Sequence, residues 1–418
     1  MTVSTAPLAS IADPGTYVAG VPYAEFARRR HEAAVSWVDE VPLWRRGEQG
    51  ARSVVGTGYW AITRHATITA VSRQPDVFSS ALRGAFLADP KSRQDLERTR
   101  QLLINMDASE HTAVRHIVTA AFTPRLIDAM QESIARHARQ LVARARDRGT
   151  FDVVRDLAAD LPLLVLADLL GMPHADRQLM FDWSNNLVGF DDADFSAGRI
   201  EVYKQTFVDA SNYAMGMAAE RRKRPTDDLV STLANGEFNG RRLTDAEFCH
   251  LWILLVVGGN ESTRHFLSGG LQALFEWPAE CARLARTPTL LPTAIEELLR
   301  WVSPIMQFRR TVSRPVEIEG QALAEGDKVA LYYTSANRDE RVFDEPDRLT
   351  LSRTPNPHLA FGIGPHFCLG ARLSRLEASV LFEALRPHLE MLEPAGPAVR
   401  LRSNFMNGIK SMPVRFRH

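Results

Sequence analysis

A single cysteine in a glycine-rich stretch constrains the fold of this chain more than any other feature. Residues 361–370 read FGIGPHFCLG, with the cysteine at position 368. Downstream, apolar residues recur at three-to-four spacing until Pro387, which predicts a helix with one buried face. Cys368 is therefore predicted to lie at a helix N-terminus, where free backbone N–H groups and the helix dipole lower the pKa of a thiol.

The glycines of this stretch indicate what the cysteine could bind. Gly362, Gly364 and Gly370 carry no side chain, so a flat group could lie against the backbone. A cysteine thiolate is one ligand that holds haem iron, and it favours O–O cleavage. Two alternatives stay open at this point. One is a buried structural cysteine, and the other is a zinc site that adds His358 and His366 to Cys368.

The stretch resembles the cysteine-ligand loop of the cytochrome P450 family, the haem-thiolate monooxygenases. Phe361, Gly364, His366, Cys368 and Gly370 stand at the signature positions of that loop. The resemblance implies that Cys368 is the axial ligand of haem b, that His366 binds a haem propionate, and that Phe361 packs near the sulfur. It also implies the P450 fold, which is mainly α with a small β lobe (α+β) and has a long central helix over the haem.

Length and composition set wider limits. The 418 residues contain no linker or internal repeat, which favours a single domain over 1–418. Lys plus Arg and Asp plus Glu number 50 each, a balance that gives no argument for binding nucleic acid or membrane. Three scattered cysteines exclude a disulfide framework and favour the cytoplasm. Residues 1–20 show neither signal peptide nor membrane anchor and are expected to be a loose segment.

A second motif lies in a predicted long helix. Thr244 and Glu247 form a capping-box pattern, and the apolar spacing continues to about Trp277. Gly258 and Gly259 fall in the middle, where each glycine costs about 1 kcal/mol relative to alanine. A helix keeps such residues where another group must approach its backbone, or where its hydrogen-bond ladder opens locally as it does at functional sites.

Residues 258–263 resemble the oxygen-activation motif on the central helix of the family. Glu261 takes the acid position and Ser262 the alcohol position, and together with water they could relay protons. The family usually has threonine where this chain has Ser262. Serine keeps the hydroxyl but lacks the methyl group that restricts the rotamer, so Thr263 could share the task.

Another pair of charges resembles the Glu-x-x-Arg motif of the family. Glu297 and Arg300 stand three residues apart on a predicted helix, and the resemblance implies that they lock the core with Arg348 as third partner. Taken alone, such a pair is common on exposed helix faces. For Glu261, the alternative to a proton relay is a salt bridge with Arg264 or Arg300.

Two cationic positions precede these motifs. His111 and Arg115 stand four apart on a predicted helix and could grip one anion together. Without the resemblance they would be read as a solvated helix face. With it, they bind one haem propionate and Arg310 reaches the second.

The β lobe and the pocket are less strongly marked. Apolar runs in 42–62, separated by Gly56-Thr57-Gly58, predict a hairpin. Residues 79–101 and 187–211 are expected to be irregular segments covering a substrate pocket. The resemblance implies a mostly apolar lining made by Leu82, Phe86, Leu87, Gly258, Gly259, Ile305, Met306, Phe308, Phe405 and Met406.

The function implied is O2-dependent hydroxylation of a lipophilic small molecule: a steroid side chain, fatty acid, terpenoid or natural-product scaffold. The chain has no flavin or iron–sulfur segment, so electrons are expected from a separate ferredoxin and ferredoxin reductase. Arg125, Arg372 and Arg375 are candidate docking residues. The alternatives are oxidative coupling, cyclisation or desaturation on the same cofactor, and a haem-fold protein that only recruits a partner.

Overall fold

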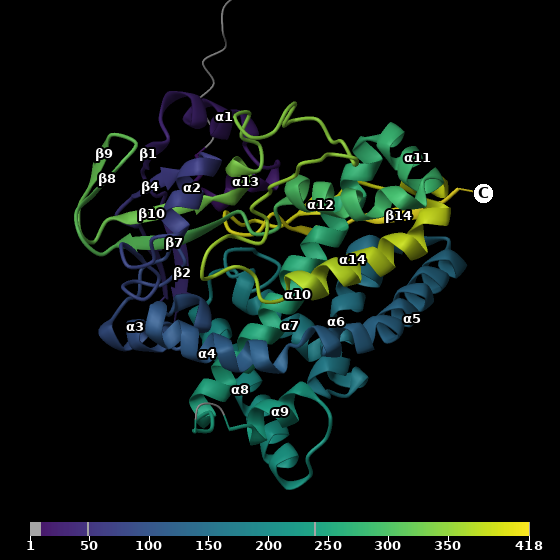
Figure 1. Cartoon of the computed structure of the whole chain (residues 1–418), viewed down its shortest axis with the longest axis horizontal. Coiled ribbons are helices and arrows are strands. Elements are labelled where there is room, and N and C mark those ends of the chain that lie inside the picture. The colour runs from purple at the N-terminus through teal and green to yellow at the C-terminus, as the bar shows by residue number, and fades with distance from the viewer. Residues whose placement is uncertain (1–9, 48–49, 238–239, 418) are drawn as a thin grey trace, which may run out of the picture.

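Helices make up most of the molecule, and a small sheet region lies at one side (Figure 1). The computed structural model describes residues 10–47, 50–237 and 240–417. The expected class, mainly α with a small β lobe, is confirmed. Among the described helices, none combines the length and the apolar character needed to cross a membrane.

The helices have the following bounds: η1 Pro14–Val18, α1 Tyr23–Glu32, α2 His65–Ser72, α3 Arg93–Thr99, η2 Leu103–Asn105, α4 Ala108–Ala121, α5 Pro124–Arg148, η3 Val154–Ala159, α6 Asp160–Leu170, η4 His174–Asp176, α7 Arg177–Val188, α8 Ile200–Lys223, α9 Leu229–Asn235, α10 Asp245–Glu276, α11 Pro278–Arg286, η5 Pro288–Leu290, α12 Leu291–Val302, α13 Tyr333–Ala336, α14 Ala371–Leu385 and η6 Arg386–Met391.

The strands have the following bounds: β1 Val35–Val38, β2 Leu43–Gly47, β3 Gly50–Val54, β4 Tyr59–Ile62, β5 Phe78–Ser79, β6 Thr150–Asp152, β7 Gln307–Val312, β8 Val316–Ile318, β9 Gln321–Leu323, β10 Lys328–Tyr332, β11 Leu392–Pro394, β12 Val399–Arg400, β13 Ile409–Ser411 and β14 Pro413–Phe416.

Helix α10 runs through the centre of the helical region, as the capping pattern predicts (Figure 1). The Thr244 side chain accepts a hydrogen bond from the Glu247 N–H, and the Glu247 carboxylate accepts one from the Thr244 N–H. Of the two explanations for Gly258 and Gly259, local opening is wrong, because the helix is continuous there. Gly259 instead permits close packing, since a Cβ at this position would lie 2.9 Å from the Leu166 side chain of α6.

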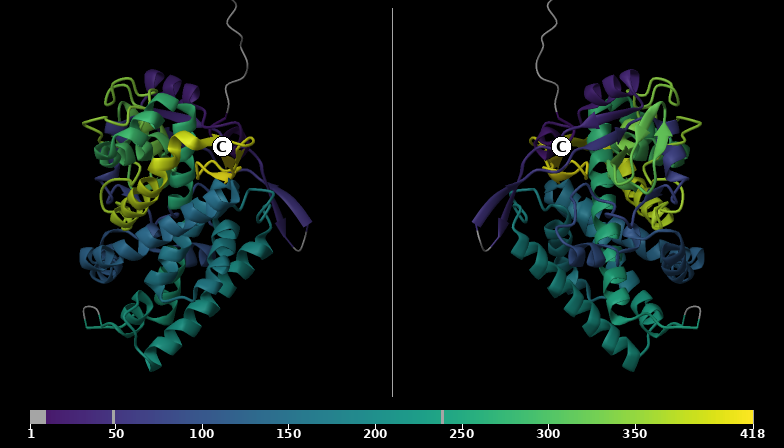
Figure 2. Two further views of the ribbon diagram at one scale, coloured as in Figure 1. Left: turned by 90° about the vertical axis from the view of Figure 1, so that its right-hand side faces the viewer. Right: turned by 90° about the vertical axis from the view of Figure 1, so that its left-hand side faces the viewer.

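The main sheet has the strand order β1-β4-β10-β7-β5 within the described part of the chain. β4 pairs antiparallel with β1 and parallel with β10. The hairpin predicted across Gly56-Thr57-Gly58 is therefore wrong, because β3 pairs with β2 and not with β4. The β2–β3 hairpin extends away from the body of the molecule (Figure 2).

Three expected irregular segments are more ordered than predicted. Residues 79–101 include α3, and 187–211 include the first half of α8, which leaves 189–199 between helices. In that connection, Asp192 is buried and pairs with Lys410 at 2.9 Å. Residues 10–20 hold η1 and bury Ile11 and Tyr17, so they are not loose. Residues 1–9 lie outside the described part of the chain.

Candidate active site

The loop 361–370 turns directly into α14, and its backbone holds the cysteine in a fixed place. The Cys368 N–H donates to the Phe361 carbonyl at 3.0 Å. Gly364 has a φ of +80°, and a Cβ there would lie 2.4 Å from the Ser72 carbonyl oxygen, so only glycine fits. Ring contacts place Phe361 between Phe367 and the Arg375 guanidinium.

The electrostatics of Cys368 differ from the prediction in one respect. Burial of the sulfur raises the pKa of the thiol, while a backbone hydrogen bond from Gly370 and the charges of Arg115 and Arg375 lower it. Burial has the larger effect, so the predicted lowering is wrong for the protein without a ligand. Helix α14 begins at Ala371, and the contributions that favour the thiolate come from the Gly370 N–H and the two arginines.

A cluster of cationic and imidazole side chains lies beside this loop. The His111 and His366 rings are 4.2 Å apart, and Arg115 on α4 donates to the Phe367 carbonyl at 2.6 Å. His366 Nε2 lies 3.3 Å from Ser80 Oγ. Burial and the neighbouring charge of Arg310 lower the pKa of His366 to about 2. The predicted set His111, Arg115, Arg310 and His366 is thus brought together by α4, β7 and the cysteine loop.

None of these four side chains is acidic, and the Asp107 carboxylate, which acts on His111 and Arg310 electrostatically, is bonded to Ser79 and Ser80. Arg310 is buried, and its guanidinium donates a hydrogen bond to the Arg309 carbonyl at 2.7 Å. Within the described ranges, neither Arg310 nor Arg115 forms an ion pair with a carboxylate, and the buried His111 Nε2 has no hydrogen-bond partner. A buried guanidinium without an anion is costly. The residues therefore fit a ligand that brings carboxylates to this place, as the propionates of haem would.

The residues of the second motif lie on α10. Gly258 is exposed and Ser262, one turn later, is partly exposed, whereas Asn260, Glu261 and Thr263 are buried. Ser262 Oγ donates to the Gly258 carbonyl at 3.0 Å. Thr263 is buried and its Oγ1 lies 3.4 Å from Ser374 Oγ on α14, one turn after the cysteine loop. Ser262 and Thr263 therefore point in different directions, with Ser262 on the open side.

Glu261 forms the salt bridge that the sequence left open as an alternative. Its carboxylate pairs with Arg264 and lies 3.4 Å from His265 Nε2, and all three side chains are buried. Burial alone would raise the pKa of Glu261, but Arg264 and His265 lower it, so the carboxylate is ionised. Arg264 NH1 also donates to Asn185 Oδ1 of α7 at 3.0 Å. Glu261 is thus fixed behind the face that carries Ser262.

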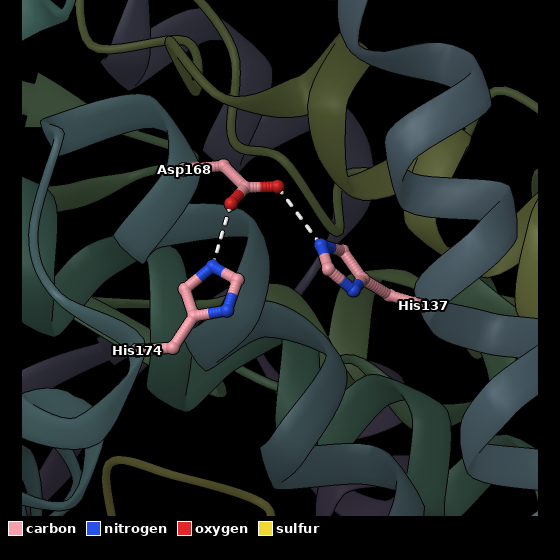
Figure 3. A group of neighbouring side chains, drawn as sticks. All are labelled: His137, Asp168 and His174. Atoms are coloured by element: carbon pink, nitrogen blue, oxygen red, sulfur yellow. Dashed lines mark hydrogen bonds and ion pairs between the residues drawn. The ribbon is translucent and has the colours of Figure 1, made fainter.

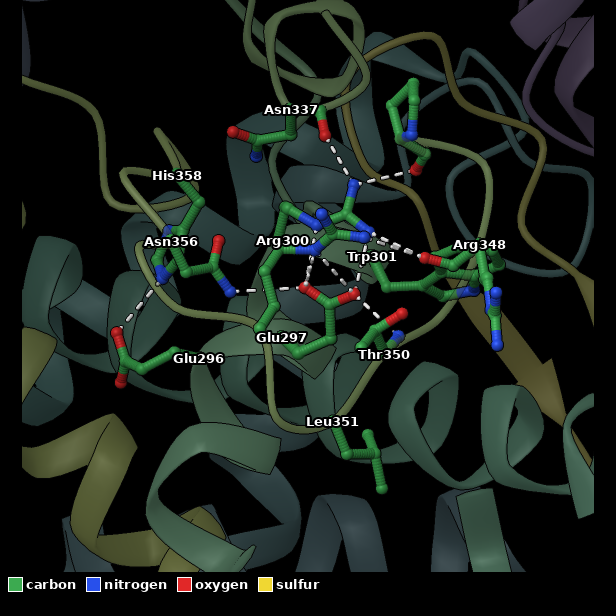
Figure 4. A network of polar contacts seen from close by, with 12 residues as sticks. Glu296, Glu297, Arg300, Trp301, Asn337, Arg348, Thr350, Leu351, Asn356 and His358 are labelled. Carbon is green, nitrogen blue, oxygen red and sulfur yellow. Dashed lines mark hydrogen bonds and ion pairs between the residues drawn. The ribbon is translucent and has the colours of Figure 1, made fainter. Parts of the chain in front are cut away.

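The Glu297–Arg300 pair is fully buried on α12, with N···O distances of 2.8 Å (Figure 4). Arg300 also donates to the carbonyls of Asn337 and Pro346. The prediction that Arg348 is the third partner of this pair is wrong. Its guanidinium is exposed and pairs with Glu345, and only its carbonyl accepts from Arg300 at 3.3 Å.

Arg353 takes the third place instead. Its Nε lies 3.1 Å from both Glu297 carboxylate oxygens, and its side chain is 9% exposed. Asn356 Nδ2 adds a bond of 3.2 Å to Glu297. Both residues follow Arg348 in a segment without regular structure, so no periodicity or spacing distinguishes them in the sequence.

The predicted pocket residues divide into two groups. Phe86, Phe308 and Phe405 form a mutual aromatic cluster with centroid distances of 5.3 to 6.1 Å. Phe308 continues to Tyr333 at 6.3 Å, and the Tyr333 hydroxyl approaches Gly362 of the cysteine loop. The cluster therefore extends toward the site. Tyr333 was not predicted, because it sits in a strand-to-helix turn with no motif.

Other predicted lining residues are placed differently. Leu82, Ile305 and Gly258 are at least partly exposed. Leu87 packs in the core beside Phe26 and Tyr59, and Gly259 faces Leu166. Met306 and Met406 are buried, because the strand-like contact between Ile305 and Met406 and the Met306 N–H bond to Phe405 turn them inward. These contacts place the four residues in packed surroundings, and their part in a pocket lining stays a prediction.

His358 and the three candidate docking arginines lie in separate surroundings. His358 Nε2 lies 3.1 Å from Glu296, so the described side chains do not bring it together with His366 and Cys368. Arg375 forms two 2.7 Å bonds with Glu296 and stacks on Phe361. Arg372 is exposed and pairs with Asp128, and Arg125 is exposed.

Comparisons with known proteins agree with this geometry. Residues 280–409 match the family model described as Cytochrome P450. The chain is 37% identical over 408 residues to the steroid C26-monooxygenase of Rhodococcus jostii, covering 97% of this chain and 84% of that protein. It is 38% identical over 395 residues to the methyl-branched lipid omega-hydroxylase of Mycobacterium tuberculosis, covering 93% and 90%.

Solved structures give the same result. A Mycobacterium marinum cytochrome P450 in complex with pseudoionone superposes with a TM-score of 0.88 at 37% identity, covering 100% of this chain and 99% of that one. A Bacillus megaterium cytochrome P450 in complex with testosterone has a TM-score of 0.79 at 30% identity, covering 95% and 100%. The structure has the cysteine loop, the cluster of His111, Arg115, Arg310 and His366, and the buried Glu297–Arg300 pair. The chain belongs to the cytochrome P450 family and is a haem-thiolate monooxygenase.

Proposed function

We propose that this chain binds haem b through Cys368 and hydroxylates a lipophilic small molecule with a sterol-like or branched-chain apolar part. The observation that carries the proposal is the cluster of Phe86, Phe308 and Phe405, partly open to solvent and connected through Tyr333 to the cysteine loop. An aromatic wall of this kind favours apolar ligands, since it offers area but few polar partners.

The cofactor would be held from three directions. Cys368 supplies the axial sulfur, Gly370 and Gly362 leave its approach clear, and His111, Arg115, Arg310 and His366 bind the two propionates. When bound, a thiolate-ligated haem supplies O–O cleavage and the oxidising power for C–H hydroxylation. The charge-assisted bonds to carboxylates would relieve the uncompensated cations of the cluster.

Proton delivery is assigned to the open face of α10. Ser262 Oγ donates to the Gly258 carbonyl, so its lone pairs are left to accept a bond from water. Glu261 stands one residue earlier and is ionised, so it must exchange its partner Arg264 before it can pass on a proton. Thr263 is the weaker candidate because its hydroxyl faces Ser374.

Substitution of Ser262 tests this assignment. Ser262→Ala should raise the share of O2 released as peroxide several-fold, because general acid–base groups contribute large factors to rate. Thr263→Ala should change it much less. Equal peroxide release from wild type and Ser262→Ala would move the relay to Thr263 or to water alone.

Two adjacent residues test the substrate wall. Phe86→Ala should weaken binding of a sterol or a branched fatty acid at least about tenfold, measured as the haem spin-state shift on titration. Leu87→Ala should lower stability and leave the dissociation constant unchanged, because Leu87 faces the core. Unchanged binding to Phe86→Ala across sterols, branched lipids and aromatic scaffolds would contradict the proposed wall.

Electrons are proposed to come from a ferredoxin and its reductase, working with the chain in the cytoplasm. Exposed Arg372 and Arg125, near the cysteine side, suit an acidic partner. Arg372→Glu should slow reduction by ferredoxin with a strong salt dependence. Arg314→Glu, an exposed arginine beside the sheet, is the matched control. Equal reduction rates for both variants would remove Arg372 from the docking surface.

A second reaction outcome, coupling, cyclisation or desaturation, is favoured by one residue. Ser262 replaces the threonine usual in the family and leaves the hydroxyl with more rotamer freedom. Product mass separates the two outcomes, since hydroxylation adds one oxygen atom and the alternatives add none.

A further inference from the structure

Three side chains of types that can bind a metal ion, His137, Asp168 and His174, lie together among the helices (Figure 3). His137 comes from the middle of α5, Asp168 from the last turn of α6, and His174 from the start of η4, just before α7. The left-handed Gly171 that ends α6 turns the chain so that His174 reaches back to Asp168. The haem site proposed above uses none of the three.

The Asp168 carboxylate lies between the two imidazole rings. Asp168 Oδ2 lies 2.8 Å from His137 Nε2, and Asp168 Oδ1 lies 2.7 Å from His174 Nε2. All three donor atoms lie within 4.8 Å of one another. Two imidazole nitrogens and one carboxylate oxygen are a common protein ligand set for zinc, with a fourth position filled by water. Small movements that break the two histidine–carboxylate hydrogen bonds would make room for a cation between the three donor atoms.

The surroundings support such a site. His137 is buried, whereas the His174 side chain is 47% exposed, so a cation has a path from solvent and a free position for water. Ser133 Oγ donates to Asp168 Oδ2 at 2.8 Å and orients the carboxylate, as partners of ligating carboxylates commonly do. Arg136 binds Ser133 Oγ at 3.0 Å and does not pair with Asp168.

We propose that His137, Asp168 and His174 bind one zinc-class divalent cation that joins α5, α6 and the start of α7. Imidazole nitrogen favours Zn²⁺, Ni²⁺ or Cu²⁺ over the oxygen-seeking Mg²⁺ and Ca²⁺. The cation would be structural. Binding only to the folded state, it would stabilise the contacts between these helices by mass action.

The test uses the full-length holoenzyme and zinc itself. Equilibrium dialysis against ZnCl2 with metal analysis should give one zinc per haem iron, and zinc but not Mg²⁺ should raise the melting temperature by at least about 2 °C. His174→Ala and Asp168→Asn should each raise the zinc dissociation constant at least about tenfold. Haem content and the far-ultraviolet circular dichroism spectrum establish that each variant is folded.

A matched surface histidine provides the control. His31 is also exposed and lies 3.6 Å from Glu340, so His31→Ala should bind zinc as wild type does. No zinc on the wild-type protein, or equal affinity in wild type, His174→Ala and Asp168→Asn, would overturn the proposal. In either case the three residues form only a hydrogen-bonded histidine–carboxylate cluster. If one variant does not fold, the other decides.

Discussion

Arg300 and Arg310 are both buried arginines, but their partners differ. Arg300 has a carboxylate, three backbone carbonyls and a neighbouring arginine that shares the same acid. Arg310 donates to a backbone carbonyl and forms no ion pair among the described residues. A buried charge needs an opposite charge. The protein itself supplies that charge to Arg300, whereas Arg310 needs a ligand to supply it.

Removing the acid of the complete lock should have the largest effect on stability. Glu297→Ala leaves Arg300 and Arg353 buried without an anion and should lower the free energy of unfolding by about 3–5 kcal/mol. Chemical denaturation of the apoprotein measures this. Glu345→Ala, which removes the acid of an exposed pair, should be nearly neutral. Equal effects of the two substitutions would break the comparison.

Removing the cation of the incomplete site should act on the cofactor instead. Arg310→Leu should weaken haem binding by about 10–100-fold, through loss of one charge-assisted contact, and should not destabilise the apoprotein. Transfer of haem to an excess of an apo-haem protein measures the affinity, with Arg314→Leu as control. If Arg310→Leu destabilises the apoprotein as strongly as Glu297→Ala and leaves haem affinity unchanged, Arg310 is structural.

Arg353 and Arg348 should differ in how much they stabilise the Glu297–Arg300 pair. Arg353→Ala removes two bonds to Glu297 and should cost about 1–2 kcal/mol of unfolding free energy. Arg348→Ala should cost almost nothing, since its guanidinium faces water. The reverse order in denaturant titrations would restore Arg348 to the lock.

The smallest effect concerns pH. Burial would raise the pKa of Glu296, but Arg375 and His358 lower it to about 2, below its ordinary value of 4.5. A lowered pKa in the folded state contributes stability that is present above about pH 4.5 and is lost as pH falls toward 2. Glu296→Gln should therefore flatten the loss of stability between pH 4.5 and 3. If the free energy of unfolding depends on pH in the same way in the wild type and in Glu296→Gln, Glu296 does not contribute this stability.

Sequence patterns predicted the features whose residues are close in the sequence. The Cys368 loop, the Thr244–Glu247 cap and the Glu297–Arg300 pair each span only a few residues, and within each of them the structure shows the expected contacts. The cation cluster was predicted only through the family resemblance, because His111, Arg310 and His366 come from three distant segments.

The errors arise where tertiary contacts decide. Arg353 replaces Arg348 because of how an irregular segment folds over Glu297, which no periodicity encodes. Leu87 and Met306 are as apolar as Phe86 and Phe308 but are buried, and composition could not tell a buried apolar position from a partly open one. The β4 strand pairs with β10, far along the chain, whereas the turn residues nearby suggested a local hairpin.

The carbon monoxide difference spectrum of the reduced protein tests the central claim most directly. If Cys368 is the axial ligand, the wild-type protein gives the thiolate-type Soret band, and Cys368→Ala loses that band together with turnover. A band typical of histidine ligation in the wild type, or an unchanged spectrum in Cys368→Ala, would contradict the assignment.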